Sequence, residues 1–372
     1  MSAPTMIGIL GGGQLGRMLA LAGYPLGFRF RFLDTAPDAP TGPLGELVVG
    51  DYRDPEVLAR FLDSVDVVTY EVETIPEATA RFAEERCPVR PGPRALAVSQ
   101  DRLVEKRFLE SVGVPVAAFA AVESVERLRA GLEATGLPAV LKTRRLGYDG
   151  RGQCVVRTWE DAVRAYQSLG GADLILERFV PFDREVSVLS VRGLDGEVRF
   201  YPLVENRHEG GILRLSRAPA PSSTDLQAEA EGFARAVLED LDYVGVLAIE
   251  FFQLGDRLFA NEMAPRVHNS GHWTIEGAET SQFENHLRAI CGYPLGSTQC
   301  VGDSAMVNLI GAIPSTEAIL SVPGAHLHLY GKTEKPGRKL GHITLRDNDA
   351  RSLQAGIERI SAVSGSALEP HG

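Results

Sequence analysis

Residues 139–153 read AVLKTRRLGYDGRGQ, and this stretch decides what kind of domain the middle of the chain forms. The apolar run that ends in Lys142 predicts a strand, whereas the glycines of residues 147–152 predict a loop. A glycine loop that carries Arg151 and follows a lysine suits a polyphosphate, because backbone amides and cations can share its negative charge. A plain surface hairpin turn is the alternative that this stretch alone leaves open.

Two predicted strands further along the chain, residues 246–252 and 258–262, each carry a glutamate. If a three-residue turn at 255–257 joins them, Glu250 lies directly opposite Glu262 on one face of the sheet. Two carboxylates that close repel unless a cation lies between them, and carboxylates that bridge to phosphates are how proteins bind Mg²⁺. A two-residue turn would instead place them on opposite faces as ordinary surface charges.

The N-terminal stretch MIGILGGGQLG, residues 6–16, predicts a strand, a glycine turn and a helix. Gly11, Gly13 and Gly16 match the G-x-G-x-x-G pattern of dinucleotide-binding domains, and Asp34 follows at the expected separation. Many α/β domains keep such glycines only to form the turn. An NAD-binding protein therefore remains an alternative at this point.

The order of predicted elements changes along the chain. Strands at residues 6–10, 28–33 and 65–70 alternate with helical stretches, which indicates a parallel sheet with helices on its faces. Between residues 174 and 262 strands mostly follow strands, which indicates an antiparallel sheet. We therefore expect an α/β fold first and an α+β fold after it.

The composition excludes several classes of protein. The 372 residues carry 38 Lys and Arg against 49 Asp and Glu, a net charge of −11, which argues against sequence-independent binding to nucleic acid. No apolar run approaches the ~18 residues that span a bilayer, and no secretory signal is visible. The 4 cysteines form no CxxC pair. We expect a cytoplasmic protein with reduced thiols, without a membrane or nucleic-acid partner.

Two polar clusters near the C-terminal half deserve separate interpretations. In HNSGHW, residues 268–273, two histidines are four residues apart, but Asn-Ser-Gly between them predicts a loop, so we do not expect zinc. His268 suits proton transfer, and a structural histidine is the alternative. Lys332 and Arg338 belong to a basic segment that suits a monophosphate, or is simply solvated surface.

Taken together, these segments resemble one family of ATP-grasp enzymes, the N5-carboxyaminoimidazole ribonucleotide synthetases of purine biosynthesis. The motifs that carry the resemblance are GGGQLGRM (11–18), QDR (100–102), EKRFL (105–109), GYDGRGQ (147–153), ERFV (177–180), REVSV (184–188), IEFF (249–252), NEMAPRVHNSGHW (261–273), YGK (330–332) and RKLGHI (338–343). Val267, Thr74 and Thr35 depart from the usual pattern of the family.

The resemblance implies an ATP-grasp fold in three parts. These are a Rossmann-like α/β domain at residues 1–99, a linker helix and small lid at 100–172, and an antiparallel-sheet domain at 173–372 that binds the substrate phosphate at about 300–350. It also implies ATP-dependent and Mg²⁺-dependent carboxylation of 5-aminoimidazole ribonucleotide with bicarbonate, one or two Mg²⁺ ions, and a homodimer. Another ATP-grasp ligase, such as a formate-dependent glycinamide ribonucleotide transformylase, is the alternative within enzymes.

The resemblance further implies roles for individual residues. The expected ATP contacts are Arg102, Lys142, Gly147, Tyr148, Asp149, Gly150, Arg151, Gly152, Gln153, Glu177, Arg178, Phe179, Val180, Glu185, His208, Asn261 and Glu262. The expected metal ligands are Glu250 and Glu262. The expected carboxylation site comprises Tyr148, Asp149, Arg151, His268 and Lys332. The expected contacts to the ribonucleotide are Gln14, Leu15, Glu73, Arg266, Lys332 and Arg338.

Overall fold

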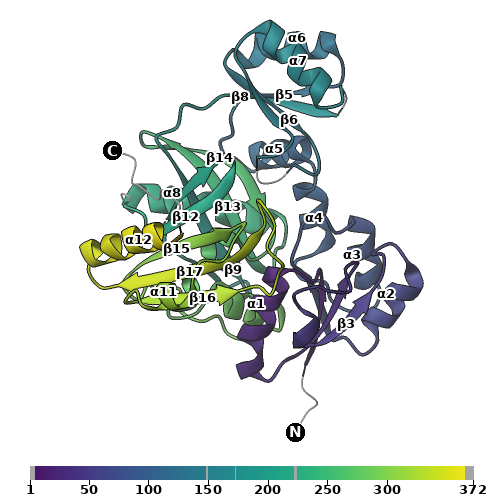
Figure 1. Ribbon diagram of the computed structural model, residues 1–372. Coiled ribbons are helices and arrows are strands. Elements are labelled where there is room, and N and C mark those ends of the chain that lie inside the picture. Colours follow the sequence, from purple (N-terminus) through teal and green to yellow (C-terminus); the bar gives the residue numbers. More distant parts are fainter. Residues whose placement is uncertain (1–4, 148–149, 172, 222–223, 365–372) are drawn as a thin grey trace.

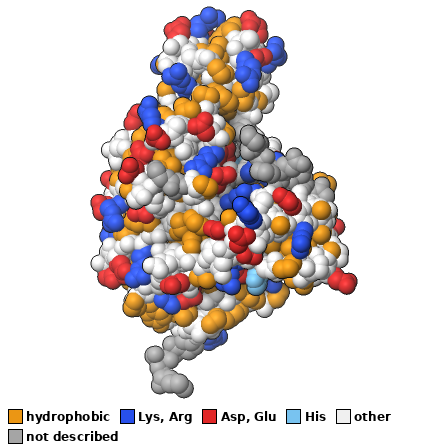
Figure 2. All heavy atoms as spheres, turned by 90° about the vertical axis from the view of Figure 1, so that its left-hand side faces the viewer, with side chains coloured by type: hydrophobic (Ala, Val, Ile, Leu, Met, Phe, Trp, Pro, Cys, Tyr) orange, Lys and Arg blue, Asp and Glu red, His pale blue; other side chains and the backbone are white. Residues whose placement is uncertain are grey.

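The chain forms three sheets that lie in three distinct parts of the molecule (Figure 1). This computed structural model describes residues 5–147, 150–171, 173–221 and 224–364. On the surface seen in Figure 2, acidic and basic side chains are interspersed, and the lid forms a separate lobe above the body. Among the described residues, no helix is both long and apolar enough to cross a membrane.

The first part is a four-stranded parallel sheet in the order β3-β2-β1-β4, which confirms the predicted α/β arrangement. Helices cover both faces, and the helix α1 also packs against α10 (Gln282–Ile290) of the third part, where Leu19 and Leu287 share one core. The elements are β1 (Met6–Leu10), α1 (Gln14–Gly23), β2 (Arg29–Asp34), β3 (Glu46–Val49), α2 (Pro55–Leu62), β4 (Val67–Tyr70) and α3 (Glu77–Glu84).

Two helices lead into the second part, a small lid. The side chain of Asp101 accepts the backbone N–H groups of Leu103 and Val104 and so begins the second of these helices. The lid is an antiparallel sheet in the order β5-β8-β6-β7 with two helices. The elements are α4 (Pro93–Ser99), α5 (Arg102–Ser111), β5 (Phe119–Val122), α6 (Val125–Thr135), β6 (Ala139–Thr143), β7 (Gln153–Val156), α7 (Trp159–Ser168) and β8 (Leu174–Arg178).

The lid sheet includes β8, which lies beyond residue 172, where the sequence placed the end of the lid. Both β5 and β6 form hydrogen bonds with β8, and Leu174 and Leu176 are fully buried in the core of the lid. An apolar run predicts a strand but does not say which sheet that strand joins. The structural lid therefore extends at least to Arg178.

The third part is a nine-stranded sheet, and its strands pair antiparallel as predicted. The chain is not one continuous strand from residue 198 to residue 209, because Pro202 has no N–H to donate and β10 ends before it. The elements are β9 (Arg184–Arg192), β10 (Val198–Phe200), β11 (Val204–Glu209), β12 (Ile212–Ala218), α8 (Thr224–Asp240), β13 (Gly245–Leu254), β14 (Arg257–Ala264), α9 (Thr274–Gly277), α10 (Gln282–Ile290), β15 (Asp303–Ile310), α11 (Thr316–Leu320), β16 (Ala325–Leu329), β17 (Lys339–Asp347) and α12 (Ala350–Ser364).

The hairpin of β13 and β14 corrects one step of the sequence argument. The turn has two residues, because Leu254 pairs with Arg257, so the predicted three-residue turn is wrong. The ladder then shifts by one residue between the pairs Phe251 with Ala260 and Glu250 with Glu262. This bulge inserts Asn261 as an extra residue, and Glu250 faces Glu262 after all.

Candidate active site

A cavity of about 240 Å³ lies between the lid and the nine-stranded sheet. Its walls come from β6, β7 and β8 on the lid side and from β9, β11, β13 and β14 on the sheet side. The predicted residues that line it are Arg102, Lys142, Gly150, Gln153, Glu177, Arg178, Phe179, Val180, Glu185, His208, Glu250, Asn261 and Glu262. Segments of the chain that are more than 100 residues apart in the sequence thus meet at one site.

A buried charge cluster forms the lid side of the cavity. The carboxylate of Glu177 lies 3.1 Å from the ammonium of Lys142 and 3.2 Å from that of Lys106. Burial alone would raise the pKa of Glu177, but the two lysines and Arg102 outweigh it and lower the pKa to about 2. Burial and the neighbouring cations Lys106 and Arg102 lower the pKa of Lys142, although the negative charge of Glu177 acts in the opposite direction. The cluster therefore combines three basic side chains, Arg102, Lys106 and Lys142, with one ionised carboxylate.

The acidic pair lies on the opposite wall. Glu262 accepts a hydrogen bond from Arg102 at 2.8 Å. Burial by itself would raise the pKa of both carboxyls. In Glu250 the facing Glu262 acts in the same direction, so the pKa of Glu250 is raised. In Glu262, Arg102 reverses the effect and lowers the pKa. Asn261 has a buried Oδ1 atom without a hydrogen-bond partner among the described residues. These oxygens fit a hard cation.

Next to the acidic pair, His208 and Glu185 form an ion pair on the same face of the sheet. Burial opposes the charged imidazole, but the hydrogen bond to Glu185 and the nearby Glu250 outweigh it and raise the pKa of His208 to about 9. His208 is therefore a cation at neutral pH, and it places positive charge beside the acidic wall of the cavity.

His268 links the acidic pair to the loop after β14. Its Nδ1 accepts the backbone N–H of Ser270, so Nε2 carries the proton and lies 3.2 Å from Oε1 of Glu250. Burial and the nearby Arg266 lower the pKa of His268 to about 3, which keeps the ring neutral. Gln282 fixes the loop, since its side chain bonds both the N–H and the carbonyl of His268. In this state the proton on Nε2 faces Glu250, and the ring does not act as a proton acceptor there.

The residues expected to bind the ribonucleotide lie where the first part meets the third. Lys332 donates to the side chain of Gln14, and Arg266 forms an ion pair with Glu73 at 2.5 Å. The side chain of Leu15 is buried in the core, so only its main chain could reach a ligand. Arg338 is exposed and donates to the carbonyl of Thr333 at 3.1 Å.

The glycine turn before α1 already holds an anion of the protein itself. The backbone N–H groups of Gly13 and Gly16 donate to the two carboxylate oxygens of Glu71, which is buried. These are the amides that would receive the phosphate of a dinucleotide. A side chain at Gly11 or Gly13 would overlap Glu71. The glycines are therefore explained by Glu71, and the NAD-binding alternative loses its basis.

The loop between β6 and β7 carries the remaining predicted ATP contacts. The carbonyl of Gly152 accepts the N–H of Thr143, and that of Gly147 accepts from Arg102 at 3.3 Å. Arg151 is exposed and does not line the cavity. Tyr148 and Asp149 lie outside the described residues, so the predictions for them are not addressed by the structure.

The sequence argument missed several residues that shape the site. Glu105 and Lys106 follow Arg102 on one face of α5, yet only their place in the motif EKRFL drew attention to them. Glu71 directly follows a predicted strand, which was a usable signal for a polar side chain at the sheet edge. Of the apolar residues that line the cavity, Phe252 belongs to the motif IEFF, whereas Val140, Val155 and Phe182 carried no recognisable signal.

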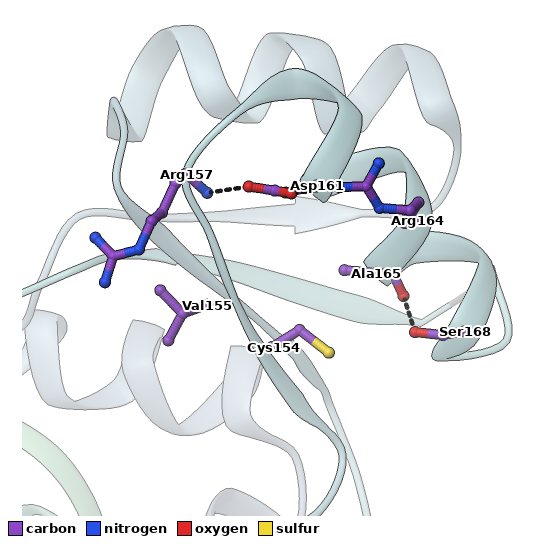
Figure 3. A pocket seen from close by; sticks show the side chains of 7 residues that line it. All are labelled: Cys154, Val155, Arg157, Asp161, Arg164, Ala165 and Ser168. Carbon is purple, nitrogen blue, oxygen red and sulfur yellow. Dashed lines mark hydrogen bonds and ion pairs between the residues drawn. The ribbon is translucent and has the colours of Figure 1, made fainter.

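A second hollow lies on the lid between β7 and α7 (Figure 3). Its polar groups satisfy one another: Asp161 accepts the N–H of Arg157 at 3.2 Å and pairs with Arg164 at 2.6 Å. Ser168 donates to the carbonyl of Ala165. It lacks the buried carboxylates and lysines of the first cavity, which is the better candidate for an active site.

A lid over an antiparallel sheet, with lysines on one wall of the cavity and an acidic pair on the other, defines an ATP-grasp protein. A family profile for the ATP-grasp domain matches residues 107–283. Profiles for the ribonucleotide synthetase preATP-grasp domain and the phosphoribosylaminoimidazole carboxylase C-terminal domain match residues 4–100 and 304–356. The chain belongs to the N5-carboxyaminoimidazole ribonucleotide synthase family.

Individual relatives cover nearly the whole chain. The N5-carboxyaminoimidazole ribonucleotide synthase of Pseudomonas aeruginosa is 56% identical over 357 residues, which are 96% of this chain and 99% of the relative. The crystal structure of the Thermus thermophilus synthetase is 60% identical, with a TM-score of 0.94 over 99% of this chain and 100% of that one. The Aspergillus clavatus synthase, solved with ADP and 5-aminoimidazole ribonucleotide, is 33% identical, with a TM-score of 0.91 over 98% and 100% of the two chains.

Proposed function

We propose that this protein uses ATP to carboxylate 5-aminoimidazole ribonucleotide with bicarbonate, giving N5-carboxyaminoimidazole ribonucleotide, ADP and phosphate in purine biosynthesis. The observation that carries the proposal is the contact between His268 and Glu250. It joins the acidic pair of the cavity to the loop that carries Arg266, which pairs with Glu73 close to the polar pair of Gln14 and Lys332. Relatives that match nearly the whole chain are named for this product.

Mg²⁺ is part of the proposal, with Glu250 and Glu262 as its protein ligands and Asn261 beside them. The unpartnered Oδ1 atom of Asn261 and the raised pKa of Glu250 are both expected of a site built for a cation. Among the described residues, no three His, Cys, Asp or Glu side chains gather closely enough to hold a metal. This fits Mg²⁺, which commonly takes one or two carboxylates and completes its ligands with substrate phosphates and water. When bound, it neutralises charge on the transferred phosphoryl group.

The protein groups suit the activation of bicarbonate, whose carbon is a weak electrophile. An oxygen of bicarbonate attacks the γ-phosphorus, ADP leaves, and carboxyphosphate forms. Lys142 and Arg102 would stabilise the charge that spreads over the phosphoryl oxygens. The exocyclic amine of the ribonucleotide then bonds to the carboxyl carbon and loses a proton, and phosphate leaves. Arg151, Tyr148 and Asp149, from the lid loop, would exclude water from this reactive intermediate.

The other site residues receive the roles that the family resemblance suggests. We assign the ATP-binding wall to Glu177 through Val180, with Glu185 and His208 towards the ribose. The loop from Gly147 to Gln153 would cover the phosphates. Lys332, Arg338, Gln14, Glu73 and Arg266 would hold the ribonucleotide, and Leu15 would contribute only main-chain atoms.

The purified protein tests the proposal directly. ATP turnover should rise when 5-aminoimidazole ribonucleotide is added with bicarbonate and Mg²⁺, and ¹³C from labelled bicarbonate should appear in the ribonucleotide product. Glycinamide ribonucleotide with formate serves as the control for the rival ligase reaction. ATP turnover that does not rise with 5-aminoimidazole ribonucleotide, or that rises with glycinamide ribonucleotide and formate instead, would refute the assignment.

The proposal includes a cytoplasmic homodimer, as the resemblance implies. Purine biosynthesis uses small soluble metabolites, which agrees with that location. Light scattering coupled to size-exclusion chromatography measures the assembly; a mass near 80 kDa, twice the 40.2 kDa of the chain, is the expected result. A mass near that of one chain would contradict the dimer and leave the proposed reaction untouched.

A further inference from the structure

One turn of the helix α5 holds β14 on both sides of the bulge. Arg102, Glu105 and Lys106 are spaced i, i+3 and i+4, so their side chains share one face of the helix. Lys106 donates to the carbonyl of Ala260 at 2.9 Å, before the bulge. Glu105 accepts the N–H of Met263 at 2.7 Å, after it. Between these two contacts lie Asn261 and Glu262.

The same helix turn also reaches the lid side of the cavity. Lys106 lies 3.2 Å from Glu177, which in turn lies 3.1 Å from Lys142. Arg102 bonds Glu262 at 2.8 Å. The two walls of the nucleotide cavity are therefore tied to one rigid element, although they belong to different sheets.

Lys106 and Glu105 are 1% and 2% exposed, and burying such polar side chains is unfavourable unless hydrogen-bond partners compensate. Burial and the nearby Glu262 raise the pKa of Glu105 to about 8. An apolar side chain would fill the interface between α5 and β14 at lower cost. What it would lack is a donor for the Ala260 carbonyl and an acceptor for the Met263 N–H, the two groups that fix the main chain around Asn261.

We propose that Glu105 and Lys106 are positioning residues that hold the β14 bulge and so place Asn261 and Glu262 for Mg²⁺ and the nucleotide phosphates. Neither residue touches substrate: they act through the main chain of β14, and Lys106 also acts through Glu177. This inference rests on the proposed function, because it concerns the same nucleotide site.

Calorimetric titration of the full-length protein with ADP, with and without Mg²⁺, tests the inference. Glu105→Leu removes the acceptor and should weaken ADP binding in Mg²⁺ on the order of tenfold, the usual effect of disturbing groups behind metal ligands. Its affinity for ADP without Mg²⁺ should stay within about twofold, because the lid side is unchanged. Glu105→Gln keeps an oxygen acceptor and should restore most of the affinity for ADP with Mg²⁺.

Lys106→Met supplies the second arm of the test. It should weaken ADP binding in both conditions, because Lys106 touches both walls of the cavity. Gln227→Leu is the matched control: Gln227, on α8, accepts the N–H of Leu203 at 2.8 Å, which is the same kind of contact outside the cavity. Its affinities should equal those of the unchanged protein.

Three results would overturn the inference: Glu105→Leu with unchanged affinity in Mg²⁺, Glu105→Gln as weak as Glu105→Leu, or Lys106→Met with unchanged affinity. Thermal melts identify a variant that does not fold, and if Glu105→Leu fails in this way, Lys106→Met still decides. Failure of the proposed function looks different, since ATP turnover by the unchanged protein would then not rise with 5-aminoimidazole ribonucleotide and bicarbonate, whatever these variants do to ADP binding.

Discussion

Glu250 and Glu262 face one another across a hairpin whose two-residue turn, taken alone, would put them on opposite faces of the sheet. Asn261 is the extra residue that restores the facing arrangement. The bulge leaves Asn261 without a partner residue on β13 and bends β14 locally. One inserted residue thus produces both the acidic pair and the amide oxygen beside it.

The first prediction concerns the carboxylate of Glu262. Glu262→Gln should keep an oxygen for Arg102 but remove the negative charge that would attract Mg²⁺. We expect ATP turnover at saturating Mg²⁺ to fall by about 100-fold or more, with little change in the melting temperature. Steady-state turnover over a range of Mg²⁺ concentrations, together with a thermal melt, measures both effects.

Glu46→Gln provides the comparison for this change. Glu46 also pairs with an arginine, Arg31, at 2.8 Å, but it lies in the first sheet and outside the cavity. Turnover should be normal in this variant. If Glu262→Gln retains turnover close to that of Glu46→Gln, Glu262 is not a metal ligand.

The hairpin also shows where prediction from sequence succeeds and fails. Alternating apolar residues predicted the strands around Glu250 and Glu262, because strand pattern is a local property. The bulge is contacted by Lys106 and Glu105 of α5, which lie 154 and 158 residues from their partners in the sequence, and no local pattern records such contacts. The facing pair was predicted correctly from an incorrect turn, so the result was right for the wrong reason.

The first domain gives a similar lesson. The glycine pattern predicted the strand, turn and helix around Gly13 correctly, since backbone sterics determine them. The ligand of that turn was not predictable from the pattern, because Glu71 directly follows β4 and reaches the amides only in the folded sheet. The recognised motifs located the residues of the cavity, but the buried groups that support them appeared only with the coordinates.

The second prediction tests the role of Glu71. Gly13→Ala places a methyl group against the Glu71 carboxylate and should force it from the amides of Gly13 and Gly16. Overpacking of this kind should lower the free energy of unfolding by about 1–3 kcal/mol. Because Gln14 adjoins the turn and holds Lys332, the affinity for the aminoimidazole ribonucleotide should also fall.

Calorimetric titrations with the ribonucleotide and with ADP separate these effects. ADP affinity should be unchanged, because the nucleotide cavity lies between other elements. Gly232→Ala is the control, since nothing lies near its added methyl group and it sits within the helix α8. A Gly13→Ala protein that binds the ribonucleotide normally would show that the turn does not shape that site.

The third prediction concerns pH and the contact between the first sheet and the third. His286 accepts the N–H of Val246 at Nδ1, 3.1 Å away, so its Nε2 carries the proton and donates to Thr69 at 2.9 Å. Burial lowers the pKa of His286 to about 3, whereas an unfolded chain has a histidine pKa of about 6.5. Between these values the unfolded chain binds one proton more than the folded chain at this position.

The sign of the effect follows from that difference in bound protons. A lowered pKa in the folded state means that stability is complete above pH ~6.5 and is lost as the pH falls towards 3, by up to about 1.4 kcal/mol per pH unit for one histidine. His286→Gln removes this contribution, so its free energy of unfolding should fall less steeply between pH 6.5 and pH 5 than that of the unchanged protein. The other buried histidines are present in both proteins and cancel in the comparison.

Urea unfolding at several pH values measures the slopes, and His326→Gln, which alters an exposed histidine, should leave the slope as it was. Equal slopes for His286→Gln and the unchanged protein would mean that His286 gains its proton in the folded state as readily as in the unfolded one. The bridge that His286 forms between Thr69 and Val246 would then not depend on a neutral ring.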